Sequence, residues 1–509
     1  MESGYYTELR LLLKLPSAHF FSSSPRTLDN DRQPSDKPAL GCPPRGEMPE
    51  GYNDSLQSPI TDPCLIVPRD QHTISRANIS ENAVKVLYRL KQGGYQAYLV
   101  GGGVRDLLLG REPKDFDVAT DATPEDVRRV FRNCRLIGRR FRLAHVHFGR
   151  EIIEVATFRG GGDGEEVPGE RHIENGMIVR DNRYGTREED ALRRDFTINA
   201  LYYNIADFSV IDYAGGLDDL RAGRLRLIGD DPECRYREDP VRMLRAVRFA
   251  AKLGFKIDPD CERPLIELGQ LLQDVPAARL FEEVLKLFLA GIGLESFEKL
   301  RHYDLFGRLF PATEECLAHE DQSFPITFVS RGIANTDKRV QEGKPVTPAF
   351  LFAVLLWEPA RRRYEELIAV DKSPFDAMVM AGGEVLSAQQ STVSIPKRFG
   401  LPMREIWELQ PRLEQRQGKR PFRLAAHPRF RAAYDFLVLR AESGEVDAEL
   451  AQWWTQFQEA NGEERAGMAG ARKGKRPRRR KRRPGAAAKD GAGNAAVQAP
   501  SATGSTGAD

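Results

Sequence analysis

Residues 99–117, LVGGGVRDLLLGREPKDFD, contain the pattern that indicates the fold of this chain. The pattern predicts a short strand over residues 96–100, a glycine turn, a helix over residues 104–109 and a second strand over residues 115–119. A strand–turn–helix–strand unit of this kind belongs to an α/β domain.

The glycine turn has the composition of a loop that binds phosphate through its backbone. Glycine has no Cβ atom, so the amides of Gly101, Gly102 and Gly103 can come close to a phosphate chain, and Gly102 and Gly103 are expected to bind the nucleotide. Arg105, at the start of the following helix, can add charge-assisted hydrogen bonds. The turn lacks the Gly-Lys-Ser/Thr ending of a Walker loop, and its contiguous glycines do not match a dinucleotide fingerprint.

Asp115 and Asp117 lie on the second predicted strand. Because side chains alternate along a strand, both carboxylates point to one face. Such a pair forms a hard-oxygen site suited to Mg²⁺, with Mn²⁺ as the alternative. Two ions about 4 Å apart can activate a 3′-hydroxyl and stabilise a leaving pyrophosphate. Glu154 is a candidate third carboxylate, because an acid inside the apolar predicted strand 152–158 is unusual without a partner.

Beyond this segment the sequence changes from mixed strands and helices to helices. Thr123 and Pro124 predict the start of a helix, with Thr123 as the N-cap. Another strand is expected over residues 144–148. From residue 195 almost to residue 460 helical spacing dominates, which predicts an α/β head followed by an all-helical body.

The bulk composition is that of a protein with several domains and no membrane segment. A chain of 509 residues suggests roughly two to four domains. The apolar run at residues 349–357 is about half as long as a bilayer span, and no cleavage site follows the first leucines, so a signal peptide is not expected. The six cysteines are scattered without a CxxC pair, which favours the cytoplasm over a disulfide framework or a zinc site.

The net charge of +2 hides a strong asymmetry. Residues 472–483, RKGKRPRRRKRR, contain ten basic residues and no acid, which leaves about −8 for the rest. Such a segment is typical of proteins that bind a polyanion, although a solvated tail or a targeting signal has the same composition. The tail residues expected to contact nucleic acid are Arg472, Lys473, Lys475, Arg476, Arg478, Arg479 and Arg480.

Together these motifs resemble the signature of class II nucleotidyltransferases, the family of bacterial poly(A) polymerases and tRNA CCA-adding enzymes, whose palm resembles that of DNA polymerase β. The similarity continues through residues 182–204 (NRYGTREEDALRRDFTINALYYN), 212–216 (DYAGG) and 237–249 (REDPVRMLRAVRF), and covers about residues 64–460. It implies an α/β nucleotidyltransferase (polymerase β-like) head followed by a helical neck and body that bind RNA.

The resemblance implies roles for residues 193–199, RRDFTIN. Arg194 would contact the triphosphate of the incoming nucleotide, Asn199 its sugar, and Asp195 would complete the acidic site. Asp195 could also be the N-cap of a helix that reaches residue 200. Either Asp195 or Glu154 is the third carboxylate; we favour Glu154 as a metal ligand and Asp195 as an essential active-site acid.

A second block starts at Glu238, where the sequence predicts a new helix with Pro240 in its first turn. In the family the EDxxR pattern carries base recognition, so Glu238, Asp239 and Arg242 are expected to bind the nucleobase, and Arg245 to join the nucleotide site. On an unrelated helix, the basic stripe would simply be a solvated face. The stripe consists of Arg242, Arg245, Arg248 and Lys252.

Two stretches favour a poly(A) polymerase over a CCA-adding enzyme. Residues 136–148 and residues 421–434 each resemble segments typical of bacterial poly(A) polymerases. The second supplies Arg423, Arg429 and Arg431 with interleaved aromatics, which suits phosphate contact and base stacking on single-stranded RNA; helix-packing aromatics with exposed arginines are an equal alternative. The remaining rivals are a CCA-adding enzyme and a catalytically inactive RNA-binding protein.

The expected function is addition of AMP from ATP to the 3′ ends of single-stranded RNA, in support of RNA polyadenylation and decay. RNA-decay or RNA-chaperone proteins are candidate partners. The expected divisions are a disordered extension (1–63), the head (64–205), a helical base-recognition neck (206–290), a helical body with the arginine-rich region (291–460) and a disordered basic tail (461–509).

Overall fold

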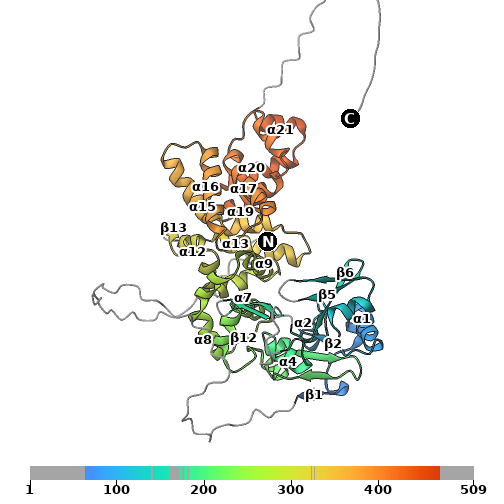
Figure 1. The fold of residues 1–509 in the computed structure, drawn as a ribbon. Helices are drawn as coiled ribbons and strands as arrows, with labels where there is room; N and C mark the ends of the chain where they lie inside the picture. Colours follow the sequence, from blue (N-terminus) through green and yellow to red (C-terminus); the bar gives the residue numbers. More distant parts are fainter. Residues whose placement is uncertain are drawn as a thin grey trace, which may run out of the picture.

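The computed structural model describes residues 64–470, apart from 139–141, 161–170, 175–176, 182, 322–323 and 326. Figure 1 shows a head that contains the main sheet and a column of helices that leads away from it to α21. The head runs from β1 (Leu65–Val67) to α5 (Gly216–Ala222). The predicted disorder of residues 1–63 and of the tail from residue 471 lies outside the described residues.

A mixed sheet of eight strands forms the centre of the head. Within it, β3 and β6 run parallel and the other neighbouring pairs are antiparallel. Its spatial order is β1, β10 (Val210–Asp212), β9 (Leu201–Asn204), β2 (Ala97–Val100), β3 (Asp117–Thr120), β6 (Glu151–Thr157), β5 (Leu143–Phe148) and β4 (Cys134–Ile137).

The sheet extends further along the chain than the sequence predicts. β9 and β10 lie after residue 195, where helices were expected, and β10 carries the sheet past the predicted head boundary at residue 205. Both strands are short and almost wholly buried. They therefore lack the polar–apolar alternation that reveals a strand in a sequence.

Side-chain alternation in the sheet builds a core on each face. Leu99 and Val118 face the helices α1 (Glu81–Gln92), α2 (Gly102–Leu108) and α3 (Pro124–Val130). On the other face Tyr98, Val100 and Ala119 pack with Ala191 of α4 (Arg187–Arg193). The predicted cap of α3 is confirmed, because Thr123 and Asp126 form a capping box.

The neck begins with two helices joined by a sharp break. α6 (Pro232–Glu238) ends where the sequence predicts a helix to begin, and α7 spans Val241–Leu253 with Pro240 as its N-cap. Asp239 lies between them with φ −151° and ψ 89°. The prediction was wrong because a residue that precedes proline is disfavoured in the helical conformation.

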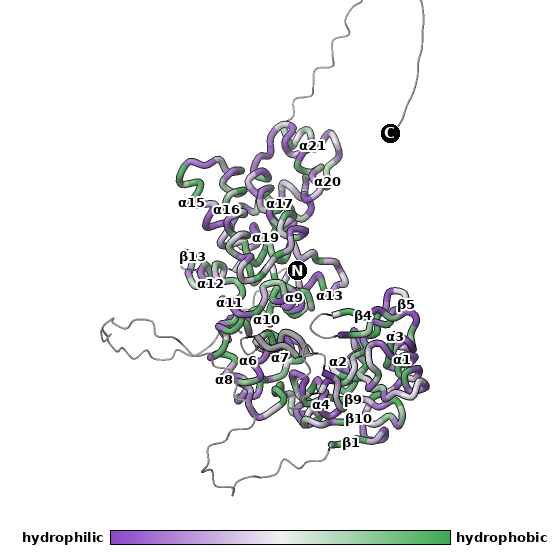
Figure 2. Tube along the Cα trace, viewed as in Figure 1, coloured by the Kyte–Doolittle hydropathy of each residue, from purple (hydrophilic) through white to green (hydrophobic). Residues whose placement is uncertain are grey.

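The rest of the described chain is almost entirely helical, as predicted. In Figure 2 green and purple residues alternate along the same helices, as expected of amphipathic helices. None of the described helices is long and apolar enough to cross a membrane. The further helices of the neck are α8 (Pro259–Glu267) and α9 (Ala277–Phe288), and those of the body are α10 (Gly293–His302), α11 (Leu305–Leu309), α12 (Pro311–Leu317), α13 (Phe328–Gln341), α14 (Pro348–Leu355), α15 (Trp357–Ala369), α16 (Pro374–Gln389), α17 (Lys397–Leu413), α18 (Arg420–Ala425), α19 (Phe430–Glu442), α20 (Ala448–Glu459) and α21 (Gly462–Met468).

The last helix corrects the predicted start of the disordered tail. Asn461 caps α21 and forms a capping box with Glu464. The amide of Gly418 donates to the carbonyl of Ala469, which ties the end of the described chain to the body. Order therefore continues to residue 470, and the glycine and alanine content of this segment misled the prediction.

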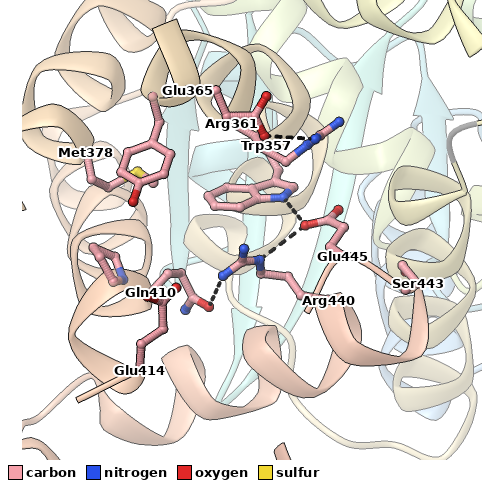
Figure 3. A pocket seen from close by; sticks show the side chains of 12 residues that line it. Trp357, Arg361, Glu365, Met378, Gln410, Glu414, Arg440, Ser443 and Glu445 are labelled. Atoms are coloured by element: carbon pink, nitrogen blue, oxygen red, sulfur yellow. Dashed lines mark hydrogen bonds and ion pairs between the residues drawn. The ribbon is translucent and has the colours of Figure 1, made fainter. Parts of the chain in front are cut away.

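A cavity of about 280 Å³ lies between α15, α17 and α19 in the body (Figure 3). Trp357 and Arg440 both donate to Oε2 of Glu445, at 2.8 and 3.1 Å, and Arg440 also donates to Gln410 at 3.3 Å. Trp357, Gln410 and Arg440 come from α15, α17 and α19, and Glu445 lies in the segment after α19. Their hydrogen bonds explain the polar lining of the cavity. They link α15, α17 and α19 and so stabilise the body.

Candidate active site

Two acidic side chains, Glu154 and Asp115, lie near Asp117 at the start of β3. β3 and β6 pair Asp117 with Glu154 in parallel register. Asp115 lies in the segment before β3, which begins at Asp117 and not at residue 115 as predicted. The strand therefore does not carry both aspartates, although the charge of Asp115 still acts on Asp117.

The surroundings of Asp117 oppose the negative charge of its carboxylate. Burial raises its pKa from 3.8 to about 6; Glu154 and Asp115 also raise it, whereas Arg194 lowers it. A carboxylate whose ionisation is opposed by two acidic neighbours is one that a bound cation would stabilise. The side chain of Glu154 is 48% exposed, so its carboxylate is open to solvent.

Among the glycines of the turn, Gly101 is the one whose backbone requires glycine. Its φ of 69° and ψ of −136° lie in a region that L side chains rarely adopt. A Cβ atom there would stand 3.5 Å from Nη1 of Arg194 and 3.9 Å from Oδ2 of Asp117. Gly102 and Gly103 form the first turn of α2. The missing side chain therefore leaves open the space between Arg194 and Asp117.

We expect Gly101→Ala to reduce nucleotide transfer at least about ten-fold, because the methyl group enters this space. Backbone strain should also cost about 1 kcal/mol of stability. Gly110→Ala is the matched control, since Gly110 has the same φ of 69° but no atom within 4 Å of the added Cβ. Steady-state kinetics and urea unfolding of both variants separate the two effects. Equal transfer activity in Gly101→Ala and Gly110→Ala would show that the space beside Gly101 is not used in nucleotide transfer.

Arg194 is held in place by a buried hydrogen-bond network that the sequence does not reveal. Its guanidinium donates to Oδ2 of Asp190 (3.0 Å) and to the hydroxyl of Tyr202 (3.1 Å), and that hydroxyl donates to Asp190 (2.6 Å). Burial opposes the charge of Arg194, but Tyr202 and Asp190 outweigh burial and raise its pKa. Asp190 precedes Arg194 by four residues, a helical spacing that could have suggested the pair; Tyr202 leaves no such local signal.

The structure corrects the predicted surroundings of Arg105 and Asn199. Arg105 is only 2% exposed and donates to Asp106 and to Oδ1 of Asn199, the latter at 2.6 Å. The amide group of Asn199 donates in turn to Asp195 at 3.2 Å. Arg105 is therefore engaged inside the protein and not presented to a phosphate. It was misassigned because sequence cannot tell a buried arginine from an exposed one.

Asp195 joins the head to the neck. Its Oδ2 accepts from Nε of Arg245 at 2.7 Å, and its Oδ1 accepts from the amide of Phe196 at 2.9 Å. Burial raises the pKa of Asp195, but the ion pair with Arg245 and these hydrogen bonds outweigh burial and lower it to about 2. The expected helix is one 3₁₀ turn (η3, Thr197–Asn199) with Phe196 as its N-cap, so the N-cap alternative for Asp195 is wrong.

Glu238, Asp239 and Arg242 meet at the break between α6 and α7. Oε2 of Glu238 accepts from Arg235 and from Arg242, each at 2.9 Å. Arg235 also donates to the carbonyl of Arg194 at 2.6 Å, so this cluster contacts the Arg194 segment directly. On the other side, Arg279 donates to Oδ2 of Asp239 at 2.7 Å. The sequence reading missed Arg235, although it lies three residues before Glu238, and Arg279, which comes from the distant helix α9.

The basic stripe on α7 is not a solvated face. Its four side chains lie against acidic partners in the head and neck, and Lys252 donates to Asp106 at 3.1 Å. The stripe therefore connects two parts of the chain through charge pairs. Its pairs are Arg242–Glu238, Arg245–Asp195, Arg248–Glu283 and Lys252–Asp106.

In the predicted arginine-rich region, Arg423, Arg429 and Arg431 are exposed. By contrast, Phe430 and Tyr434 are only 6% and 8% exposed and pack in the core of the body. These two aromatics therefore fit the helix-packing alternative and are not placed to stack on RNA bases. The basic residues 472–483 lie outside the described residues.

Family models match three consecutive parts of the chain. The poly A polymerase head domain matches residues 97–226, the probable RNA and SrmB-binding site of polymerase A matches residues 254–317, and the polymerase A arginine-rich C-terminus matches residues 370–486. The head model ends at residue 226, beyond the expected boundary at residue 205, in agreement with the extent of the sheet.

Curated relatives point to the same family. The chain is 53% identical to poly(A) polymerase I of Salmonella typhi over 82% of its own length and 91% of that protein. The chain belongs to the poly(A) polymerase family. Poly(A) polymerase I of Haemophilus influenzae is 48% identical over 79% of this chain and 89% of that protein. The CCA-adding enzyme of Geobacillus stearothermophilus is a more distant relative, 40% identical over 41% of this chain and 49% of that enzyme.

The chain is accordingly an enzyme, a polynucleotide adenylyltransferase that adds AMP from ATP to RNA 3′ ends without a template. Among solved structures, the Thermotoga maritima CCA-adding enzyme complexed with tRNA covers 81% of this chain and 96% of its own, with a TM-score of 0.50 and 19% identity. That likeness supports the predicted nucleotidyltransferase head followed by helices.

Proposed function

We propose that Asp115, Asp117 and Glu154 bind the divalent cations, Mg²⁺ or Mn²⁺, of adenylate transfer. The observation that carries this proposal is the parallel register of Asp117 with Glu154, together with the raised pKa of Asp117. Carboxylate oxygens are the donors that both cations prefer. Among the described residues, no group of three or more His, Cys, Asp or Glu side chains is arranged so that it could hold a metal ion.

When bound, such cations supply positive charge for the attacking 3′-hydroxyl and the departing pyrophosphate. Asp195 has a different role, because its carboxylate is bound by Arg245. It keeps the head, Asn199 and the neck in their relative positions, and so acts as a positioning residue of the site.

The chain's own contribution to binding the triphosphate is the space beside Gly101. Arg194 borders this space and is fixed by Asp190 and Tyr202. A guanidinium that is already oriented loses little conformational entropy when it binds a phosphate. Arg105 supports this arrangement from inside through its hydrogen bond to Asn199.

The cluster of Glu238, Asp239 and Arg242 selects the nucleobase. Arg235 and Arg279 hold these groups, so the protein presents one fixed pattern of donors and acceptors. A base that matches a fixed pattern is favoured over one that leaves buried polar groups unpaired, and this discrimination needs no template.

RNA beyond the 3′ end would follow the exposed Arg423, Arg429 and Arg431 and the basic residues 472–483. Phosphate attraction carries no sequence information, which suits an enzyme that acts on diverse RNAs. Consistent with its scattered cysteines, the enzyme would work in the cytoplasm, with RNA-decay or RNA-chaperone proteins as candidate partners.

Supplying each nucleoside triphosphate singly, with an unstructured RNA primer, tests the choice of nucleotide. We expect long extension with ATP and little incorporation of CTP, GTP or UTP. Gel analysis of the primer gives both the length and the nucleotide preference. Strong CTP addition that stops after two residues would identify a CCA-adding activity and contradict the proposed selection of ATP.

Deleting residues 472–483 should weaken RNA binding most at low salt, because ten positive charges are removed. The dependence of log Kd on log salt should become shallower by about 0.7 for each RNA phosphate that the shortened enzyme no longer neutralises. Titration of the enzyme into labelled RNA at several salt concentrations measures this slope. An unchanged slope would mean that the segment does not contact RNA.

A further inference from the structure

A histidine lies beside the carboxylates in the head sheet. His145 on β5 is directly opposite Glu154 on β6, and Glu154 is in register with Asp117 on β3. Directly opposed residues on neighbouring strands point to the same face of a sheet. His145, Glu154 and Asp117 therefore form one row across three strands.

The contact between the first two members of the row is close. Nε2 of His145 lies 3.2 Å from Oε1 of Glu154. The ring is not aligned for a hydrogen bond to that oxygen, and Nε2 is buried with no other hydrogen-bond partner in the described residues. A buried polar atom without a partner is costly, so a small rotation that completes this hydrogen bond is favoured.

The two side chains differ in freedom. Glu154 is 48% exposed, whereas His145 is only 16% exposed and has its ring against the edge of His147, at 6.3 Å between centroids. A flexible carboxylate loses conformational entropy when it binds a cation, and a fixed neighbour that has already oriented it reduces this loss.

We propose that His145 is a positioning residue that orients Glu154 for cation binding. Nε2–H donates to Oε1 of Glu154, which leaves Oε2 directed towards the cation beside Asp117. A neutral imidazole can make this hydrogen bond, so the role does not require a change of protonation. Mg²⁺ prefers oxygen ligands, so His145 acts through Glu154 and not as a ligand itself. The inference rests on the proposed role of Glu154.

His147 provides the matched control within the same strand. It lies two residues further along β5, and its partner on β6 is Ile152, which has no carboxylate. Nε2 of His147 is also buried without a hydrogen-bond partner in the described residues. Replacing His147 therefore removes a comparable ring, together with its edge contact to His145, and leaves the His145–Glu154 pair in place.

The experiment measures Mn²⁺ binding to the full chain by electron paramagnetic resonance, with an ATP analogue whose α,β-methylene group prevents transfer. We compare His145→Leu, His145→Gln, His147→Leu and Glu154→Gln with the unsubstituted protein, and record thermal melting of each. His145→Leu should weaken Mn²⁺ binding about ten-fold, within the range known for residues that orient metal ligands. His145→Gln keeps an N–H donor near the position of Nε2 and should restore binding to within about three-fold.

The outcomes separate this inference from the proposed function. If Glu154→Gln weakens Mn²⁺ binding but His145→Leu does not, Glu154 is a ligand and the role of His145 is refuted. If Glu154→Gln has no effect, the proposed role of Glu154 fails, and with it the basis for His145. An equal loss in His147→Leu would show that packing of the strand, and not the hydrogen bond, is responsible. The double variant His145→Leu/Glu154→Gln should lose no more than Glu154→Gln alone.

Discussion

Asp117→Asn should abolish adenylate transfer and, at neutral pH, stabilise the metal-free protein. The loss of a charged cation ligand should lower the rate at least about a thousand-fold, which corresponds to several kcal/mol of transition-state stabilisation. The gain in stability arises because the ionised carboxylate is disfavoured by burial and by Glu154 and Asp115.

The pH dependence of this stabilisation has a definite sign. The pKa of Asp117 is about 6 in the folded protein and 3.8 in its ordinary state. A carboxyl group with a raised pKa in the folded state destabilises the fold increasingly as pH rises from about 4 to about 6, and fully above that. Removing the charge should therefore contribute up to about 3 kcal/mol at pH 7 and little at pH 4.

Urea unfolding in the presence of a chelator, at pH 4, 5.5 and 7, measures the stability difference, and primer extension measures transfer. Glu112→Gln is the control, because Glu112 is exposed and close to the site in sequence. It should change neither property. Transfer by Asp117→Asn at the normal rate would overturn the assignment of the cation site.

Asp195→Asn should destabilise the protein by about 3 kcal/mol and lower transfer. The substitution removes the charged partner of Arg245, whose Nε donates to Oδ2 of Asp195 at 2.7 Å and whose Nη2 lies 2.5 Å from the same oxygen in an ion pair. Breaking a buried ion pair leaves one charge without compensation, which costs about 3–5 kcal/mol when both groups are fully buried. The side chain of Arg245 is 31% exposed, so the lower end of this range applies.

The sign of the pH effect is opposite to that for Asp117. The pKa of Asp195 is lowered from 3.8 to about 2. Its contribution to stability is therefore present above pH 4 and is lost as pH falls from about 4 towards 2. Urea unfolding at pH 7 and pH 3 should show a smaller difference between the variant and the parent protein at the lower pH.

An exposed ion pair of similar geometry provides the control. Asp218 accepts from Arg221 at 2.8 Å on the surface of α5, with side chains 75% and 67% exposed. Asp218→Asn should leave stability almost unchanged, because solvent screens such pairs. A double-mutant cycle of Asp195→Asn with Arg245→Met isolates the coupling energy. No coupling in that cycle would show that the pair does not join the head to the neck.

Much of the fold follows from local sequence signals. Thr123 caps α3, and the glycine turn that begins at Gly101 leads into α2, as the sequence predicts. These features depend on residues a few positions apart, so periodicity and capping rules predict them. Short buried strands such as β9 carry no such local pattern and were missed.

The roles of the charged residues could not be predicted from local signals. The sequence shows that Arg105, Arg242 and Arg245 are basic, but not whether each is buried or which acid it binds. Arg245 meets a carboxylate fifty residues away, and Arg105 meets an amide ninety-four residues away. Such pairs arise only when distant segments pack together, so spacing along the chain cannot predict them.

By itself, the sequence determined the chemistry: a glycine turn followed by two aspartates predicts phosphate and cation binding, and the later motifs predict a nucleotidyltransferase. Only the tertiary structure shows which of these residues lie together. The parallel pairing of β3 with β6 brings Glu154 to Asp117, whereas the packing of α7 brings Arg245 to Asp195. The physical reason is that residue type sets what a group can bind. Register and burial set what it does bind.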